Sequence, residues 1–250
     1  MRSARTTLGL AAVATVALAV AAPSPATAGG HDHHDGTLET VVDGLNGPRG
    51  VDALGHGRTL VTESDGTFSL VVEHRGGEAP EVVRLGQVAT DFAPAIAAGT
   101  HHTVWLLTGG APPDSPAADG GATLFRWRPG WDAPEPFADI AAYQASDPDP
   151  YDLEDLPGDS NPFGLAALKD GSVLVADAAG NDLLHVWPDG SIETVARLKP
   201  RNVTVPDGLP DAGTTVPAEA VATSVTVGKD GAWYVGELRG YPATAGTSQI

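Results

Sequence analysis

The feature that most restricts the fold is a recurring block of four short apolar segments, separated by turns rich in aspartate and glycine. In the clearest copy, residues 161–198, the turns lie at 169–171, 180–182 and 188–190. Turns of this composition between apolar runs predict β-hairpins. Each block therefore predicts a four-stranded antiparallel sheet, whose strands we label a to d in chain order.

Three other copies of the block flank the clear one. One begins at Pro48, a more diverged one at Pro94, and another at Thr223, with a third segment starting near Ser248. Repetition of a four-strand unit every 40 to 60 residues, roughly, is typical of a β-propeller. A β-sandwich is the main alternative, but it predicts evenly spaced strands without copying of whole blocks. The expected fold class is therefore all-β, a β-propeller of four-stranded blades.

The two ends of the repeat region bear on how the ring closes. Residues 38–45 resemble strand d of the clear copy and precede any a strand. An N-terminal d strand completes the last blade of a propeller and removes an open edge. The last copy, however, stops inside its c segment. Either a four-bladed ring is closed by the N-terminal strand or, as we favour, residues 38–250 form about four blades of a C-terminally incomplete propeller.

The first residues predict export. Arg2 and Arg5 supply positive charge, residues 8–20 are uncharged and apolar, and residues 26–28 read Ala-Thr-Ala, a small-residue cleavage pattern. The apolar run is shorter than the ~20 residues that span a bilayer. We therefore expect a signal peptide over 1–28, a disordered leader rich in His and Asp over 29–37, a secreted or extracytoplasmic protein, and no membrane anchor.

Composition excludes several classes of function. The chain has 32 acidic and 14 basic residues, a formal net charge of −18, and no cysteine. An acidic surface repels phosphate backbones, so nucleic-acid binding is not expected. Thiol catalysis and cysteine-ligated zinc are excluded. The sequence also contains no Gly-x-Ser-x-Gly elbow, Walker loop, dinucleotide fingerprint or His-Glu-x-x-His motif.

Three segments carry a family resemblance: residues 160–168, 175–184, and 223–242. They resemble the ScyD/ScyE family, over about residues 38–250. The resemblance implies an exported propeller of about six blades and no established activity. More distantly, the Asn161 and Asp177 segments are similar to gluconolactonase-like and strictosidine-synthase-like propellers, some of which hold a metal at the ring centre.

Candidate site residues follow from the topology of a propeller, in which the d-to-a and b-to-c connections emerge on one face, the loop face. Carboxylates end three b strands, and polar or charged side chains lie in the d-to-a connections: Glu63, Asp177, Glu237, Arg49, Ser160, Asn161, Thr223 and Ser224. Carboxylate oxygens suit Ca²⁺ or Mg²⁺, and a carboxylate with a raised pKa can act as a general base. Alternatively, an acid repeated at each b-strand end accepts hydrogen bonds from the adjoining turn. Thr108 breaks this repeat.

Two further segments suggest metal binding without requiring it. The loop 146–162 carries six carboxylates and no basic residue, but lacks EF-hand spacing, so we favour an extended, solvated insertion. Cleavage after Ala28 would expose Gly29, Gly30 and His31 at the mature N-terminus. Its amine, two amides and imidazole form a square-planar site suited to Cu²⁺. A polar leader without metal is the alternative.

Two functions therefore remain. The favoured one is a secreted, non-enzymatic propeller that binds a small molecule, glycan or protein on its loop face. The alternative is a metal-assisted hydrolase or lyase resembling the gluconolactonase-like propellers, with Ca²⁺ at that face. The residues expected to bind the ligand or metal are the same in both cases: Glu63, Asn161, Asp177, Glu237 and Arg49.

Overall fold

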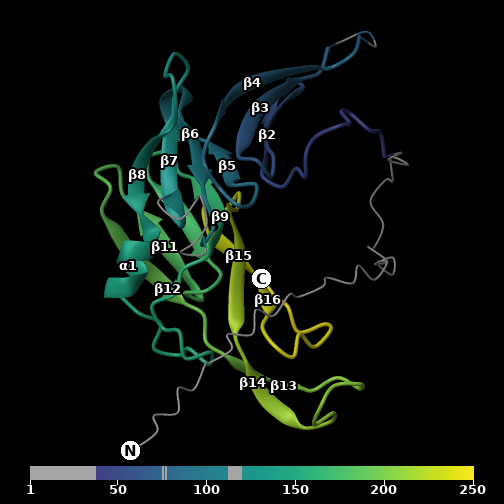
Figure 1. Cartoon of the computed structure of the whole chain (residues 1–250), viewed down its shortest axis with the longest axis vertical. Coiled ribbons are helices and arrows are strands. Elements are labelled where there is room, and N and C mark those ends of the chain that lie inside the picture. The colour runs from purple at the N-terminus through teal and green to yellow at the C-terminus, as the bar shows by residue number, and fades with distance from the viewer. Residues whose placement is uncertain (1–37, 75, 77, 112–119) are drawn as a thin grey trace, which may run out of the picture. The chain divides into compact units, whose positions relative to one another are not determined.

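The computed structural model describes residues 38–74, 76, 78–111 and 120–250 (Figure 1). The fold described below belongs to the compact unit formed by Thr40–Ile250. Within the described ranges, no helix is long and apolar enough to cross a membrane.

Three antiparallel sheets each contain four strands in chain order (Figure 1). The first has β1 (Val51–Gly55), β2 (Arg58–Thr62), β3 (Thr67–Val72) and β4 (Glu81–Gln87). The second has β5 (Ala95–Ala98), β6 (Val104–Leu107), β7 (Thr123–Trp127) and β8 (Glu135–Asp139). The third has β9 (Pro162–Ala167), β10 (Val173–Asp177), β11 (Asp182–Val186) and β12 (Ile192–Arg197). These sheets correspond to the first three predicted copies of the block.

The fourth copy forms a two-stranded sheet of β15 (Ala220–Val227) and β16 (Trp233–Arg239). Gln249 makes an isolated antiparallel bridge to Glu237, where the sequence predicts the start of strand c. Between the third and fourth copies lies a hairpin that the sequence pattern did not predict, β13 (Arg201–Thr204) with β14 (Thr215–Ala218). A short helix, α1 (Ile140–Ser146), and a single 3-10 turn (Thr100–His102) complete the described elements.

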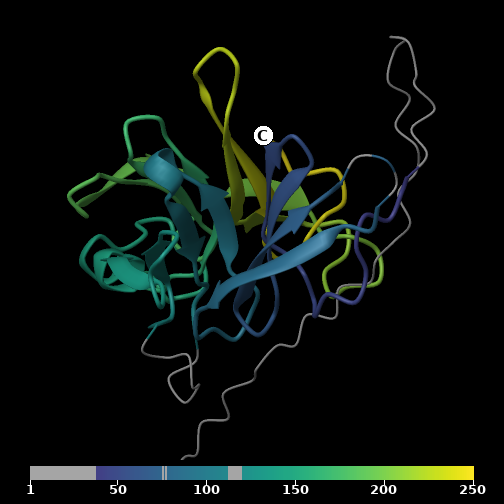
Figure 2. The same ribbon diagram turned by 90° about the horizontal axis from the view of Figure 1, so that it is seen from above.

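The first strands of successive sheets pack against one another in the order β1, β5, β9, β15. Strand b of each sheet also contacts strand a of the next, as β2 does with β5 and β10 with β15. The sheets can be followed from blue through teal and green to yellow in Figure 2. Consecutive four-stranded meanders joined in this way through their first strands are blades of the propeller type, and the all-β prediction is confirmed.

Residues 38–45 form no strand in the structure, unlike the closing d strand predicted for them. A strand needs a neighbour to satisfy its backbone groups, and the described part of the last sheet contains β15, β16 and the single bridge at Gln249. A partner for a d strand is therefore missing from the described residues. The number of blades and the incompleteness of the ring remain predictions.

The core lies between neighbouring sheets. Phe68 of the first sheet packs edge-on against Trp127 of the second, with ring centroids 5.4 Å apart. Leu124 of the second sheet and Leu184 of the third belong to another buried cluster. Each such side chain contributes about 1.5–3 kcal/mol of hydrophobic stabilisation. In the second and third sheets, strands b and c are the most buried, because these sheets have a neighbouring sheet on each side.

The aspartate–glycine turns form as predicted. The Asp170 carboxylate accepts a hydrogen bond from the Ser172 backbone N–H at 3.0 Å, and Gly171 adopts φ +92°. A side-chain acceptor two residues ahead and a glycine with positive φ define this turn. The turns around Asp189 and Asp230 repeat the arrangement. The repeat visible in the sequence is therefore a repeat of turn chemistry.

Candidate functional site

Asp177, at the end of β10, has no solvent exposure. Its carboxylate accepts hydrogen bonds from the Ser160 hydroxyl at 2.6 Å and from the Asn161 backbone N–H at 2.8 Å. The backbone N–H groups of Ala179 and Gly180 also donate to it, each at 3.1 Å. Burial raises the pKa of this carboxyl, and the hydrogen bonds oppose that rise. Asp177 thus ties the b-to-c turn to the d-to-a connection of its own sheet.

Glu237, the equivalent residue of β16, is buried in a different environment. Its Oε1 accepts from Arg201 Nη2 at 2.5 Å and also from Arg239 Nη2. Arg201 begins β13, the hairpin inserted before this sheet, whereas Arg239 lies two residues further along β16. Glu237 is therefore held by two guanidinium groups.

The two remaining b-strand ends are also bound locally. Glu63 is half-buried, and its Oε2 accepts from the Asn46 backbone N–H at 2.6 Å. Thr108, which breaks the repeat, donates its hydroxyl to the Gly120 carbonyl at 2.5 Å and accepts from the Thr123 N–H at 3.0 Å. A hydroxyl thus replaces the carboxylate as the group that binds the turn.

The carboxylates at these three b-strand ends have no partner in common. Among the described residues, no group of three or more His, Cys, Asp or Glu side chains is arranged to hold a metal ion. Asn161 lies beside Asp177, but its Oδ1 accepts from the Gly110 N–H at 3.1 Å. The contacts support the architectural alternative for this repeated acid, while a Ca²⁺ site at the loop face remains a prediction.

Arg49 is the positively charged residue among those predicted for the loop face. It lies just before β1, where its backbone N–H donates to the Thr62 carbonyl at 3.2 Å. Its guanidinium lies 3.7 Å from the centroid of the Phe163 ring, and Nη2 donates to the Phe163 carbonyl at 2.9 Å. Burial lowers the pKa of Arg49. Within the described part of the chain, Arg49 forms no ion pair with a carboxylate.

A cavity of about 270 Å³ opens beside this guanidinium, between the first strands of the four sheets. Its walls are mostly strand backbone and small or apolar side chains, with Arg49, Phe163, Thr223 and Ser224 as its charged, aromatic and hydroxyl groups. Thr223 donates its hydroxyl to the Gly236 carbonyl at 3.2 Å, and Ser224 is exposed. The cavity therefore combines one cation, one aromatic ring and two hydroxyl groups.

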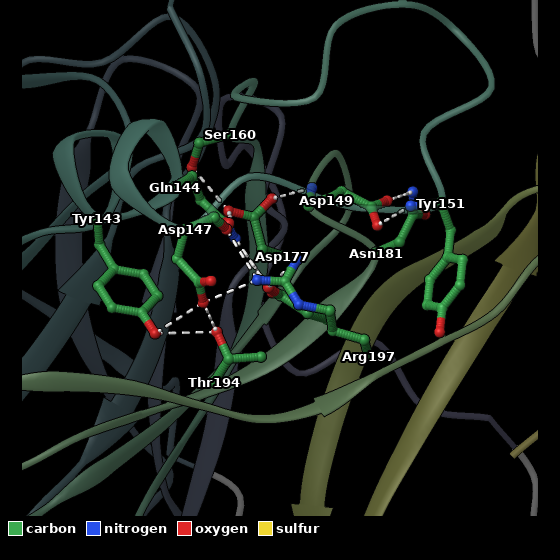
Figure 3. Close-up of polar contacts among 12 residues, drawn as sticks. Tyr143, Gln144, Asp147, Asp149, Tyr151, Ser160, Asp177, Asn181, Thr194 and Arg197 are labelled. Carbon is green, nitrogen blue, oxygen red and sulfur yellow. Dashed lines mark hydrogen bonds and ion pairs between the residues drawn. The ribbon is translucent and has the colours of Figure 1, made fainter.

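A buried polar network that the sequence pattern did not predict occupies the third sheet (Figure 3). Asp182 is directly opposite Asp177 in the β10–β11 pair. Gln144, from α1, places its Nε2 3.1 Å from both oxygens of Asp182 and 3.3 Å from Asp177 Oδ2. Burial, followed by the nearby charge of Asp177, raises the pKa of Asp182 to about 8. The Gln144 amide donates to both carboxylates and thereby joins α1 to β10 and β11.

Asp147 and Asp149 tie the start of the acidic loop into this network, which corrects the expectation of a solvated insertion for that part, whereas nearly all of residues 150–159 are exposed as expected. Asp147 forms an ion pair with Arg197 at 2.7 Å and accepts from the Thr194 hydroxyl at 2.7 Å. Asp149 is 4% exposed and accepts from Asn181 Nδ2 at 3.0 Å. These acids find neutral or basic partners on the adjacent hairpin, so part of the loop packs against the sheet.

Other predicted features are not covered by the structure. Gly29, Gly30 and His31, with the proposed Cu²⁺ site, lie outside the described residues, as do the signal peptide and the leader. Copper binding and secretion therefore remain predictions.

No protein-family model and no curated protein matches this chain. Among solved structures, it is similar to a streptogramin B lyase, with 13% identity and a TM-score of 0.43 over 80% of this chain and 53% of that chain. A virginiamycin B lyase from Staphylococcus aureus gives 15% identity and a TM-score of 0.42, covering 80% of this chain and 54% of that chain.

A third similar structure is an oxidoreductase from Thermus thermophilus, described as a glucose dehydrogenase. It gives 18% identity and a TM-score of 0.29, covering 79% of this chain and 92% of that chain. The present chain spans about half the length of the two lyases. At these identities and TM-scores, the similarities assign neither an activity nor a substrate.

Proposed function

We propose that this chain is a non-enzymatic binding module of a secreted β-propeller, and that it holds a small molecule carrying an anionic group beside Arg49. The observation that carries the proposal is the half-buried Arg49 guanidinium, which lacks a carboxylate partner within the described residues and faces the cavity shared with Phe163, Thr223 and Ser224.

The electrostatics favour an anionic ligand. The chain has a formal net charge of −18, yet within the described residues no carboxylate is paired with the half-buried Arg49 guanidinium. The Phe163 ring and carbonyl offset part of the cost of burying this charge. The planar fork of a guanidinium matches the oxygens of a carboxylate, sulfate or phosphate group. Ligand binding would therefore supply the partner that the protein does not.

The carboxylates support a binding role over catalysis. Asp177 is buried under five hydrogen-bond donors, and Glu237 is shared by two guanidinium groups. A general base or metal ligand must reach the substrate, and neither of these groups is free to do so. The metal-assisted hydrolase or lyase would have to rely on Glu63, which is half-exposed.

We also propose that the complete propeller has about six blades, as the ScyD/ScyE resemblance implies. The β15–β16 sheet supports an incomplete last blade, because it has two strands whereas the sheets β1–β4, β5–β8 and β9–β12 have four. The Glu237–Gln249 bridge gives a third strand of this sheet a starting point.

The binding proposal is tested by thermal unfolding with D-glucuronate and, as the neutral counterpart, D-glucose. Glucuronate should raise the melting temperature in a saturable way, and Arg49→Gln should abolish the shift. Arg84→Gln is the matched control because Arg84 is exposed and bonded to Gln87 in the same strand. A library of other carboxylates, sulfates and phosphates extends the test.

The proposal fails if every saturable ligand of the wild type binds Arg49→Gln equally well. A rise in melting temperature with Ca²⁺ that disappears in Glu63→Gln would instead support the metal-assisted alternative.

A further inference from the structure

A second positively charged region lies where the inserted hairpin meets the last sheet. Arg201 Nη2 contacts Glu237 and also donates to the Thr247 carbonyl at 3.0 Å. Arg239 contacts the same Glu237 oxygen. Two cations therefore share one carboxylate, which leaves one positive charge uncompensated within this group.

The buried arginine has hydrogen-bonding capacity to spare. The Arg239 side chain is 1% exposed, and its Nη1 donates to the Ala218 and Glu219 carbonyls at 3.3 and 3.1 Å. Its Nε is buried and has no hydrogen-bond partner in the described structure. An unpaired buried donor on a cation destabilises the fold.

A cavity of about 370 Å³ lies against both arginines. Its other walls come from the start of β13 and from residues 246–249. Asn202, Ser248 and Gln249 line it and are exposed, and within the described ranges their side chains make no hydrogen bond. Their amide and hydroxyl groups are therefore available to a ligand. The cavity combines excess positive charge with neutral donors and has no carboxylate among its lining residues.

We propose that this cavity, which we call the Arg201–Arg239 site, binds a small oxyanion such as a carboxylate, sulfate or phosphate group. Arg201 supplies an exposed guanidinium fork, and Asn202 and Ser248 supply neutral donors at the rim. Glu237 keeps the two arginines oriented and takes up one of their charges. The site shares no residue with the cavity beside Arg49, so it goes beyond the function proposed above.

The test is isothermal titration with inorganic phosphate at constant ionic strength in chloride buffer, repeated with acetate. The titration is carried out on Arg49→Gln, which lacks the cation of the first cavity. Any anion binding that remains belongs to the Arg201–Arg239 site, so failure of this proposal is distinguishable from failure of the Arg49 proposal. In that background we expect one saturable phosphate site. Arg201→Gln should weaken it about tenfold or more, while leaving Glu237 paired with Arg239. Arg84→Gln in the same background should have no effect.

A second variant keeps the test valid if Arg201→Gln fails to fold. Ser248→Glu places a carboxylate in the cavity at an exposed position whose side chain makes no hydrogen bond in the described structure, so the fold should be retained. It should abolish phosphate binding by repulsion. The proposal is overturned if Arg49→Gln shows no saturable binding of phosphate or acetate up to about 10 mM, a range that detects weak ligands. It is equally overturned if Ser248→Glu binds as tightly as its parent.

Discussion

Asp177 and Glu237 occupy the same position in two copies of one repeat, yet their surroundings differ in charge. Both carboxylates are buried: Asp177 is the last residue of β10, and Glu237 lies two residues before the end of β16. Asp177 is surrounded by neutral donors, and a second acid, Asp182, lies across from it. Glu237 is surrounded by Arg201 and Arg239. The surroundings of Asp177 therefore disfavour its negative charge, whereas the negative charge of Glu237 compensates the guanidinium groups that surround it.

The difference comes from the parts of the chain that do not repeat. Gln144 reaches Asp177 and Asp182 from α1, which follows the second sheet, and Arg201 reaches Glu237 from the hairpin that precedes the fourth. The four-strand block places an acid at each of these positions, and the insertions between blocks choose its partner. The insertions therefore supply partners that the repeat does not, and Arg239, within β16 itself, adds a further one to Glu237.

Removing the charge of Glu237 should have the largest effect on stability. Glu237→Gln leaves the buried Arg239 without a compensating charge and should cost about 3–5 kcal/mol of unfolding free energy. Asp177→Asn keeps an acceptor oxygen and relieves the repulsion with Asp182, so it should cost less, about 1–3 kcal/mol. Urea unfolding of the two variants at one pH measures the contrast. An equal loss in both would show that the two environments are energetically alike.

The pH dependence of stability should reveal the acidic pair. The pKa of Asp182 is raised from 3.8 to about 8 in the folded protein, so between these values the folded state binds a proton that the unfolded state has lost. Stability should therefore fall as pH rises from about 4 to about 8, by at most about 1.4 kcal/mol per unit from this group. Asp182→Asn should flatten the slope measured by urea unfolding from pH 5 to 8.

The slope should not vanish in Asp182→Asn, because burial also raises the pKa of Asp177 and acts in the same direction. Asp189→Asn is the matched control. Hydrogen bonds with Ser191 lower the pKa of that exposed carboxyl, so its contribution is lost only on acidification below this range. A slope in Asp182→Asn as steep as in the wild type would contradict the assignment.

Removing the charge of Glu63, at an equivalent b-strand end, should have the smallest effect on the free energy of unfolding. It is half-buried and accepts one hydrogen bond from the Asn46 N–H, so Glu63→Gln should cost less than about 1 kcal/mol. Urea unfolding beside Glu237→Gln gives the comparison. A loss as large as that of Glu237→Gln would mean that the position, and not its partners, determines the energy.

The strands of the three complete sheets were predictable because their turns have a local chemical cause. The carboxylate of Asp170 and the positive φ of Gly171 close a hairpin with neighbours only a few residues away. The helix α1 was not predicted, although its sequence carries a local signal. Asp139 caps it by accepting from the Ala142 N–H at 2.8 Å, and the segment that follows is rich in alanine. The β13–β14 hairpin was also not predicted: its connection, residues 205–214, contains Asp207 and Gly208 with φ +89°, but it is longer than the aspartate–glycine turns of the other hairpins.

The partners of the candidate site residues could not be predicted from the sequence, because they are contacts between residues far apart in the chain. Arg49 was predicted as a site residue, but its partner Phe163 lies 114 residues away. The sequence grouped the carboxylates of Asp177 and Glu237, whereas the structure gives each its own partners. Periodicity predicts which residues end a strand, but it contains no information about which side chain from another sheet meets them.

The sequence by itself determined the repeat: an all-β chain whose four-strand blocks end in aspartate–glycine turns, with an acid at three of the four b-strand ends. These features depend on local hydrogen bonds and backbone angles, which a few adjacent residues set. Only the tertiary structure decided that Asp177 meets Gln144 and Asp182, that Glu237 meets Arg201 and Arg239, and that Arg49 lies on Phe163. The reason is physical: the free energy of a buried charge is set by the groups that surround it, and the packing of the sheets and the insertions between them brings those groups together.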